Sequence, residues 1–241
     1  MKNDSLPVKQ KKTKKSIGTK NESSLHKTLK HQYTGFGGIS EVEAGEFIAD
    51  GITKAGEYIE VQTGSFAPLK KKVKELSSFA KVRIIHPIAV KKTIEVYKTT
   101  KTKKPLYRRK SPLKGSAWKL FDALIYAPEL PLLKGVSIEI VLADITEKRV
   151  KDGKGSWRRK GISIFDRELS SIHESILFKK LSDYLFFIPF KPGEEFTSSL
   201  LSLRAKIKKE TAQKALYVLT KMKIINRTGK KGKTWIYIRD R

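Results

Sequence analysis

Residues 50–62 read DGITKAGEYIEVQ and bring two carboxylates and an amide close together in the chain. The flanking residues fit two β-strands, and the residues around Gly56 fit the turn between them. Asp50 closes the first strand, whereas Glu60 and Gln62 share one face of the second, roughly 7 Å apart. We therefore expect Asp50 and Glu60 to converge at one end of a sheet.

The segments around this pair predict an α/β core. Leu25, Leu29 and Tyr33 have helical spacing, and Pro68 is a suitable first residue for a second helix. The expected order is helix, three-stranded meander, helix, strand. The ranges are helix 22–33, strands 39–44, 46–52 and 57–62, helix 68–79, and β-rich stretches 81–86 and 88–97. Beyond them we expect helices at 116–125 and 167–184 and strands at 136–142 and 161–165.

The side chains available for chemistry favour a hard metal ion. The chain has no cysteine, which excludes disulfides, thiolate zinc sites and cysteine nucleophiles. Its four histidines are scattered, and we expect His26 and His31 at the surface or flank of the first helix. Two carboxylates at one sheet edge suit Mg²⁺ or Mn²⁺, which can activate water and neutralise a phosphodiester. The alternatives are a turn cap for Asp50 and a solvated strand face for Glu60 and Gln62.

This arrangement resembles the PD-(D/E)XK, or restriction-endonuclease-like, nuclease superfamily. Its signature is an acidic residue on one strand and acidic-x-Lys on the next, within an αβββαβ core. Here Asp50 is followed, after nine residues, by Glu60-Val61-Gln62. The resemblance covers roughly residues 21–90 and implies Asp50 and Glu60 as metal ligands and Glu22 as a helper. We expect the nuclease-like core to span residues 21–126. Glu22 could instead only stabilise the N-terminus of its helix.

The chain departs from the superfamily at Gln62, which stands where the lysine is expected. A glutamine amide can orient water but carries no positive charge. Some superfamily members take the lysine from the following helix, so the lysines of that helix are the candidates here. Lys72 lies about 60° from the centre of the buried stripe, which makes it the best substitute, with Lys70 second. The alternative is a lysine that only covers the edge of the core. His86, at a strand end nearby, is a candidate phosphate or water contact.

The charge of the chain predicts a polyanionic partner. Lys and Arg number 52 against 24 Asp and Glu, a net charge of +28. Nucleic acid is the expected partner, and DNA the expected kind. No run of 18 apolar residues predicts a membrane span. Residues 1–20 hold seven lysines and one acid and are expected to form a disordered basic tail.

Two further basic runs lie in the middle of the chain. A loop ahead of the helix at 116–125 carries Arg108, Arg109 and Lys110, whose charges fit phosphate oxygens. A second loop follows Trp157, whose ring could stack on an unpaired base or pack in a core. We expect this second loop to belong to a basic accessory α+β region over residues 127–190. Its nucleic-acid contacts are predicted to be Arg158, Arg159 and Lys160.

Residues 191–241 have the layout of a winged helix-turn-helix domain. Thr197 caps a helix at 198–207, a longer helix follows at 209–223, and a hairpin follows with a basic glycine tip. The helix expected at 167–184 could serve as the first helix of this domain. Lys209 and Lys214 could lie in a major groove, while Lys230, Lys231 and Lys233 could contact the phosphate backbone. A winged helix can instead bind protein.

The leading hypothesis is a cytoplasmic DNA-binding protein, nucleoid-associated if prokaryotic, that hydrolyses phosphodiesters with Mg²⁺ or Mn²⁺. One alternative is a regulatory DNA-binding protein with a degenerate nuclease core, which the missing superfamily lysine keeps open. Another is an RNA- or ribosome-associated basic protein. A homodimer is also open, because superfamily members with a single site often cut two strands as pairs.

Overall fold

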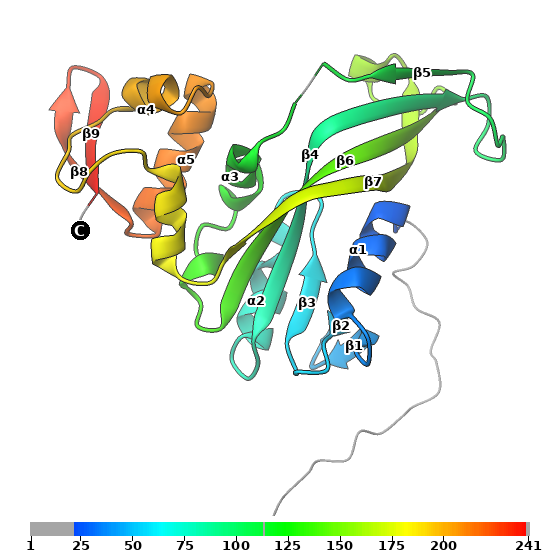
Figure 1. The fold of residues 1–241 in the computed structure, drawn as a ribbon, viewed down its shortest axis with the longest axis horizontal. Helices are drawn as coiled ribbons and strands as arrows, with labels where there is room; N and C mark the ends of the chain where they lie inside the picture. Colours follow the sequence, from blue (N-terminus) through cyan, green and yellow to red (C-terminus); the bar gives the residue numbers. More distant parts are fainter. Residues whose placement is uncertain (1–21, 113, 240–241) are drawn as a thin grey trace, which may run out of the picture.

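The computed structural model describes residues 22–112 and 114–239, and the basic segment 1–20 lies outside the described residues. Figure 1 shows one large curved sheet with helices on both faces and a smaller helical part at the C-terminal end. The α/β class predicted from the sequence is confirmed. The helices are α1 (Ser24–Thr34), α2 (Lys70–Leu76), α3 (Leu120–Leu124), α4 (Ser198–Arg204) and α5 (Lys209–Lys221). Short 3₁₀ helices are η2 (Ala67–Leu69), η3 (Ala117–Lys119), η4 (Leu130–Leu132), η5 (Trp157–Arg159) and η6 (Leu181–Phe187).

The large sheet has seven strands in the order β1-β2-β3-β4-β6-β7, with β5 also paired to β4. Strands β3, β4 and β6 are parallel, and the other neighbours are antiparallel. The strands are β1 (Ile39–Ala44), β2 (Phe47–Ile52), β3 (Tyr58–Val61), β4 (Val82–Tyr97), β5 (Tyr107–Lys110), β6 (Val136–Lys151) and β7 (Ile162–Phe178). The first part of the chain therefore follows the expected order of helix, three-stranded meander, helix, strand.

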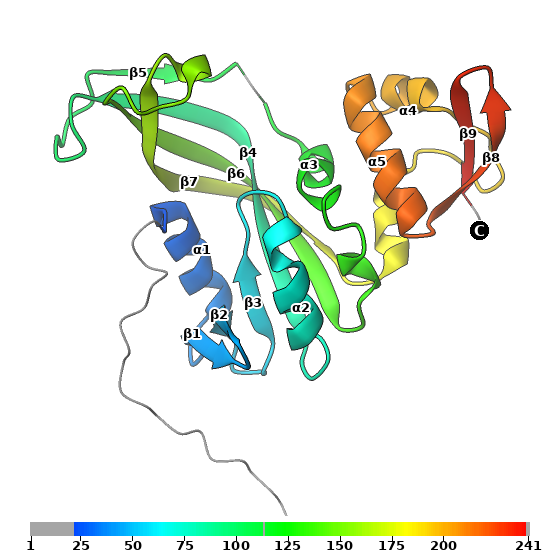
Figure 2. The same cartoon turned by 180° about the vertical axis from the view of Figure 1, so that it is seen from behind.

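Alternating side chains of the sheet build a separate apolar core on each face. Ile59 and Val61 of β3 pack with Leu25 and Leu29 of α1 on one face. Tyr58 of the same strand packs on the other face, with the cluster that contains α2. Figure 2, seen from behind, shows α2 on this second face. The end of the β2–β3 pair thus lies between two helices, each of which can supply side chains to it.

Strand β4 is longer than predicted because it runs through Pro87 without a break. Its neighbour β3 ends before this point, where the Gln62 N–H donates to the Ile85 carbonyl at 2.9 Å. Pro87 is two residues further along β4, so its backbone nitrogen is on the same side as that of Ile85. Within the described residues β4 has no partner strand on that side at this point, and no hydrogen bond is lost. Proline is tolerated in a strand at such a position. On its other side β4 stays paired with β6 throughout.

The helix predicted at 167–184 is wrong, because residues 162–178 form β7. Leu169, Ile172 and Ile176 have a spacing that also fits a helix, but pairing with β6 over the full length of the strand satisfies the backbone. Residues 127–190, expected as an accessory region, supply β6 and β7 to the same sheet as β3 and β4. The long strands β4, β6 and β7 extend past α1 as a curved arm, with β5 along it (Figure 1).

The C-terminal part consists of α4, α5 and the hairpin of β8 (Ile225–Lys231) and β9 (Thr234–Arg239). Thr197 caps α4 as predicted, by accepting from the Leu200 N–H. Phe196 pairs with Tyr237 of β9 in an isolated bridge. Leu216 and Leu219 of α5 share one apolar core with the sheet. The C-terminal part is therefore packed on the rest of the fold. None of the helices in the described ranges has the length and apolar composition needed to cross a membrane.

Candidate active site

Asp50 on β2 and Glu60 on β3 hydrogen-bond across their two strands. Towards this end, the backbone pairing of the strands stops at Gly51 and Ile59. One position further, Asp50 Oδ2 accepts from the Val61 N–H at 2.7 Å, and Glu60 Oε1 accepts from the Asp50 N–H at 3.3 Å. Beyond the last paired residues of β2 and β3, the two side-chain carboxylates therefore accept hydrogen bonds from the backbone N–H groups of the opposite strand. The two acids that the sequence predicted to converge lie together.

Gly51 allows this end of β2 to pack closely under α1. A Cβ on Gly51 would lie 2.2 Å from Thr34 Oγ1, far inside van der Waals contact. Thr34 itself is buried. Asp50 and Gly51 both lie within a strand, so the alternative of a turn cap for Asp50 is wrong. The glycine is needed for close packing beside the acid.

Glu60 is a buried carboxylate between a negative and a positive group. Its side chain is 3% exposed, and Lys72 Nζ from α2 lies 2.6 Å from it. Burial raises the pKa of Glu60 and the charge of Asp50 raises it further, to about 7, against the opposing effect of Lys72. Burial is therefore the main reason that Glu60 takes up a proton more readily than an exposed glutamate does.

The three lysines at the start of α2 point to three different carboxylates. Lys70 pairs with Glu129 at 3.0 Å and Lys71 pairs with Glu46 at 2.9 Å, both at exposed positions. The helical wheel predicted that Lys72 is nearest the buried stripe, and its side chain is 15% exposed beside Glu60. Only Lys72 of these three reaches the carboxylate site.

His26 on α1 links Asp50 to Glu22. Its Nε2 lies 3.2 Å from Asp50 Oδ2, and its Nδ1 is hydrogen-bonded to Glu22 Oε1. Burial alone lowers the pKa of His26, but the hydrogen bonds to Asp50 and Glu22 outweigh it and raise the pKa. For Asp50, burial raises the pKa, but His26 and the Val61 N–H outweigh this and lower it. The imidazolium thus keeps Asp50 ionised. His26 was expected at the surface or flank of the first helix; it lies half-buried in the first turn of α1, between these two carboxylates.

Glu22 lies behind His26, not beside Asp50. It also pairs with Lys30, whose Nζ is 2.9 Å from Glu22 Oε1. Burial raises the pKa of Glu22, but the hydrogen bonds from Lys30 and His26 outweigh it and lower the pKa. Glu22 was expected to help bind metal. In the structure it orients an imidazole that in turn holds Asp50. Its spacing of four residues from His26 was the sequence signal for this contact.

Asp50 and Glu60 form the pair that fits a divalent cation. Their donor atoms are carboxylate oxygens, which suit Mg²⁺ or Mn²⁺. Burial and the charge of Asp50 raise the pKa of Glu60, and an added cation would favour its ionised form. Within residues 22–112 and 114–239, no cluster of three or more His, Asp or Glu could hold a metal. Any ion here would take only these two protein carboxylates, with other oxygens completing its shell.

Gln62 and His86 organise the turn that follows β3. The Gln62 amide Nε2 donates to the Ser65 carbonyl at 2.5 Å. The backbone carbonyl of Gln62 accepts a hydrogen bond from His86 Nδ1 at 2.6 Å. His86 is buried, and its ring meets Phe66 edge-on at 5.1 Å. Gln62 was predicted to position water or metal, but its amide nitrogen holds the turn next to the carboxylates.

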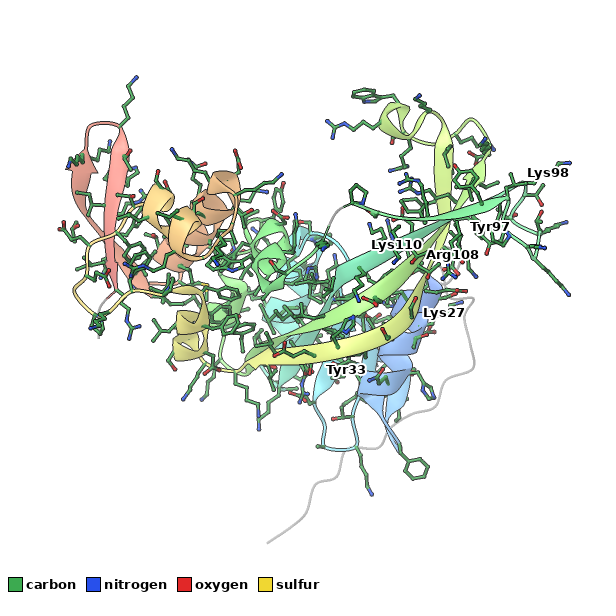
Figure 3. The ribbon with its side chains drawn as sticks, turned by 45° about the horizontal axis from the view of Figure 1, so that its top comes forward. Lys27, Tyr33, Tyr97, Lys98, Arg108 and Lys110 are labelled. Carbon is green, nitrogen blue, oxygen red and sulfur yellow. The ribbon has the colours of Figure 1, made fainter. Side chains whose placement is uncertain are left out.

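Strand β5 lies where a loop was predicted, and it carries Arg108, Arg109 and Lys110. The strand pairs with the distal half of β4, and its residues are exposed. Figure 3 shows Arg108 and Lys110 on this strand beside the end of β4. Arg108 Nε lies 3.4 Å from Glu95, at an exposed position. The pairing with β4 fixes the spacing of these cations along the arm.

Trp157 stands in solvent at the tip of the β6–β7 connection. It is 82% exposed, so the alternative of core packing is wrong. Arg158 lies over its ring at 5.5 Å from the centroid. Arg159 Nε donates to the Ile162 carbonyl, and Lys160 has a positive φ of 49°. The arm therefore ends in an exposed indole ring among cations.

The predicted cations of the C-terminal part separate into two groups. Lys214 Nζ lies 2.6 Å from Asp122 of α3, so this lysine joins α5 to the core and does not stand free for a groove. Lys209 and Lys233 line a cavity of about 400 Å³ between α5 and the hairpin, together with Trp235. Lys230 lies over the Trp235 ring at 4.1 Å, and Lys231 is exposed.

Comparison with known proteins places the carboxylate site within a shared region. An uncharacterized protein of Treponema pallidum (strain Nichols) is 29% identical over 164 residues. The aligned region covers 68% of this chain and 64% of the relative, so the chain spans less than two thirds of the relative's length. No solved structure matches the chain. A family model described as a domain of unknown function, DUF8091, matches residues 23–179, from α1 to the end of β7. Because this match covers more than half of the chain, the protein belongs to the DUF8091 family.

Proposed function

We propose that this protein is a DNA-binding phosphodiester hydrolase of PD-(D/E)XK type that uses Mg²⁺ or Mn²⁺. The observation that carries the proposal is the position of buried Glu60, between the carboxylate of Asp50 and the ammonium of Lys72. Paired carboxylates with an adjacent lysine are what metal-assisted cleavage of a phosphodiester needs. We expect the protein to act on nucleic acid, in the cytoplasm.

The topology around the site supports this reading. Helix α1, the meander β1-β2-β3, helix α2 and strand β4 follow one another in the αβββαβ order, with β3 parallel to β4. Lys72 comes from α2 and stands in for the lysine that the superfamily places two residues after the second acid. Gln62, at that superfamily position, is available to hold the adjacent turn.

Each group has a distinct role in the proposed reaction. Asp50 and Glu60 would hold the ion, which when bound lowers the pKa of a coordinated water and offsets phosphate charge. Lys72 would stabilise the negative charge that develops on the phosphate oxygens. His26 keeps Asp50 ionised and correctly oriented through its contact with Oδ2. Burial raises the pKa of Glu60 to about 7, and a bound cation would favour its ionised form.

Two basic surfaces support DNA as the substrate. The arm carries the cations of β5 and η5 together with Trp157. The C-terminal part has the order expected of a winged helix, because α4 and α5 precede the hairpin, and Phe196 forms an isolated bridge to Tyr237 of β9. The 3₁₀ helix η6 would take the place of the first helix that was predicted at 167–184. Lys209, Lys231 and Lys233 would contact the phosphate backbone.

A regulatory DNA-binding protein without catalysis is the second candidate. The ion pair that Lys72 makes with Glu60 favours it, because the lysine could neutralise the acid permanently. The two candidates share the DNA-binding surfaces and differ only at the carboxylates. An RNA-associated protein would share the basic surfaces but prefer structured RNA.

The test is a cleavage screen with Mg²⁺ or Mn²⁺ over linear, branched and damaged DNA and structured RNA. Wild type should cut DNA, and Asp50→Asn and Glu60→Gln should stop cutting while DNA affinity is retained. Glu75→Gln, an acid on the same helix as Lys72 but away from the site, is the matched control and should cut normally. Equal activity of wild type and both site variants would reject the hydrolase. Preference for RNA over every DNA form would favour the RNA-associated alternative.

A further inference from the structure

A cavity of about 590 Å³ lies at the turn that follows β3, the strand that carries Glu60. Its walls include the turn at residues 63–65, the middle of β4 with His86, and residues of α3. The turn is the one that Gln62 holds, through its amide to Ser65 and its carbonyl to His86. The turn therefore connects the cavity to the strand that carries Glu60, and these hydrogen bonds keep the turn in place.

The cavity is lined by more positive than negative groups. Lys92, Lys114, Lys119 and Arg167 line it, against the single acid Asp122. Lys119 pairs with Asp122, and Lys92 and Arg167 reach Glu147 at 3.5 and 3.3 Å. No carboxylate in the described part of the chain pairs with Lys114. A net positive charge is left at the cavity, which suits a phosphate group.

The remaining lining suits the uncharged part of a nucleotide. Ile88, Ala89 and Ile145 provide an apolar wall for a sugar and base. His86 is 6% exposed, and its Nδ1–H is committed to the Gln62 carbonyl. The edge-on contact with Phe66 fixes the plane of its ring. The cavity thus combines a rigid polar ring, an apolar wall and cations.

We propose that this cavity binds one nucleotide of the substrate strand, next to the phosphodiester that is positioned at Asp50 and Glu60. The cations hold its phosphate, and the apolar wall receives its sugar and base. The inference rests on the proposed function for the choice of a nucleic-acid strand. In this proposal the cavity holds one nucleotide of the strand before the strand is cleaved.

The probe is thymidine 3′,5′-bisphosphate, a single nucleotide with a phosphate at each end, titrated in EDTA and followed by calorimetry. Wild type should bind it, and thymidine without phosphates should not bind measurably. Lys114→Glu should weaken binding roughly 10- to 100-fold, as expected for the loss of a charge-assisted phosphate contact. Lys54→Glu makes the same charge change at an exposed site on the β2–β3 turn, and should alter binding less than about 2-fold.

The outcomes separate this inference from the hydrolase proposal. Binding that falls in Lys114→Glu but persists in Lys54→Glu and in Glu60→Gln supports the cavity, even if no substrate is cut. Absence of binding to wild type, or an equal loss in both lysine variants, overturns the nucleotide site. The hydrolase proposal would then stand or fall on its own cleavage screen.

Discussion

His26 Nε2 lies 3.2 Å from Asp50 Oδ2, and the other ring nitrogen of His26 is bonded to Glu22. The first turn of α1 is thereby tied to the end of β2. Because both ring nitrogens face carboxylates, the protonated imidazolium is the form that satisfies them. Asp50 is thus held in place by α1, a helix that precedes β1 in the chain.

Replacing His26 should reduce cleavage without unfolding the protein. In His26→Leu, Asp50 loses the partner that orients it, and loss of such a partner typically costs about 10- to 100-fold in metal affinity or activity. The matched control is His31→Leu, an exposed histidine further along the same helix. Cleavage rates at several Mn²⁺ concentrations test this. Equal rates for the two variants would show that the His26 contact does not matter to the reaction.

Glu147 should make stability depend on acid pH. Its side chain is 2% exposed and contacts Arg149, Lys92 and Arg167. Burial raises the pKa of Glu147, but these cations outweigh it and lower the pKa from 4.5. A carboxyl with a lowered folded-state pKa stabilises the fold above about pH 4.5, and this contribution is lost as pH falls through the folded-state pKa.

Glu147→Gln should therefore lower the free energy of unfolding at pH 7. We expect somewhat less than the about 3–5 kcal/mol that breaking a fully buried ion pair costs, because Lys92 and Arg167 are partly exposed. The difference from wild type should shrink by pH 3. Urea denaturation at the two pH values measures it. A difference that is the same at both would assign the effect to packing instead of charge.

Trp157 should contribute to binding of unpaired nucleic acid. Stacking of a base on an exposed aromatic ring is worth about 1–3 kcal/mol, so Trp157→Ala should weaken single-strand affinity about 5- to 150-fold. Duplex affinity, which depends on phosphate contacts, should change much less. Fluorescence anisotropy with labelled oligonucleotides measures both. Phe36→Ala removes another fully exposed ring, on the α1–β1 turn, and should leave both affinities unchanged.

The core of the fold was predictable because its signals are local. Strand β1 has the predicted bounds, and the turn at Gly56 with its flanking strands followed from residue type and alternation. Lys72 was predictable because a helical wheel needs only the apolar stripe of one helix. These features depend on neighbours within a few positions.

The rest depends on contacts between distant segments. Residues 167–184 were predicted as a helix, and only the long pairing of β7 with β6 decides otherwise. The partner of Lys214 could not be known before α5 was packed against α3. The role of His26 required knowing that α1 crosses the end of β2. Periodicity within one segment contains none of this information.

Lys72 and Glu60 are proposed to act together in phosphodiester cleavage. Lys71 provides a matched control, because it is adjacent to Lys72 in the same helix but points to Glu46 at the surface. The variants Lys72→Met and Lys71→Met remove the same charge from neighbouring positions. Circular dichroism and thermal unfolding establish that both are folded before their rates are compared.

The decisive measurement is the single-turnover cleavage rate of labelled DNA with Mn²⁺ for wild type and these two variants. Lys72→Met should cut about 100- to 1,000-fold more slowly, the usual cost of removing one group that stabilises transition-state charge. Lys71→Met should cut at the wild-type rate. Equal rates for the two variants, or no cleavage by wild type on any substrate, would contradict the assignment of this site as a hydrolase.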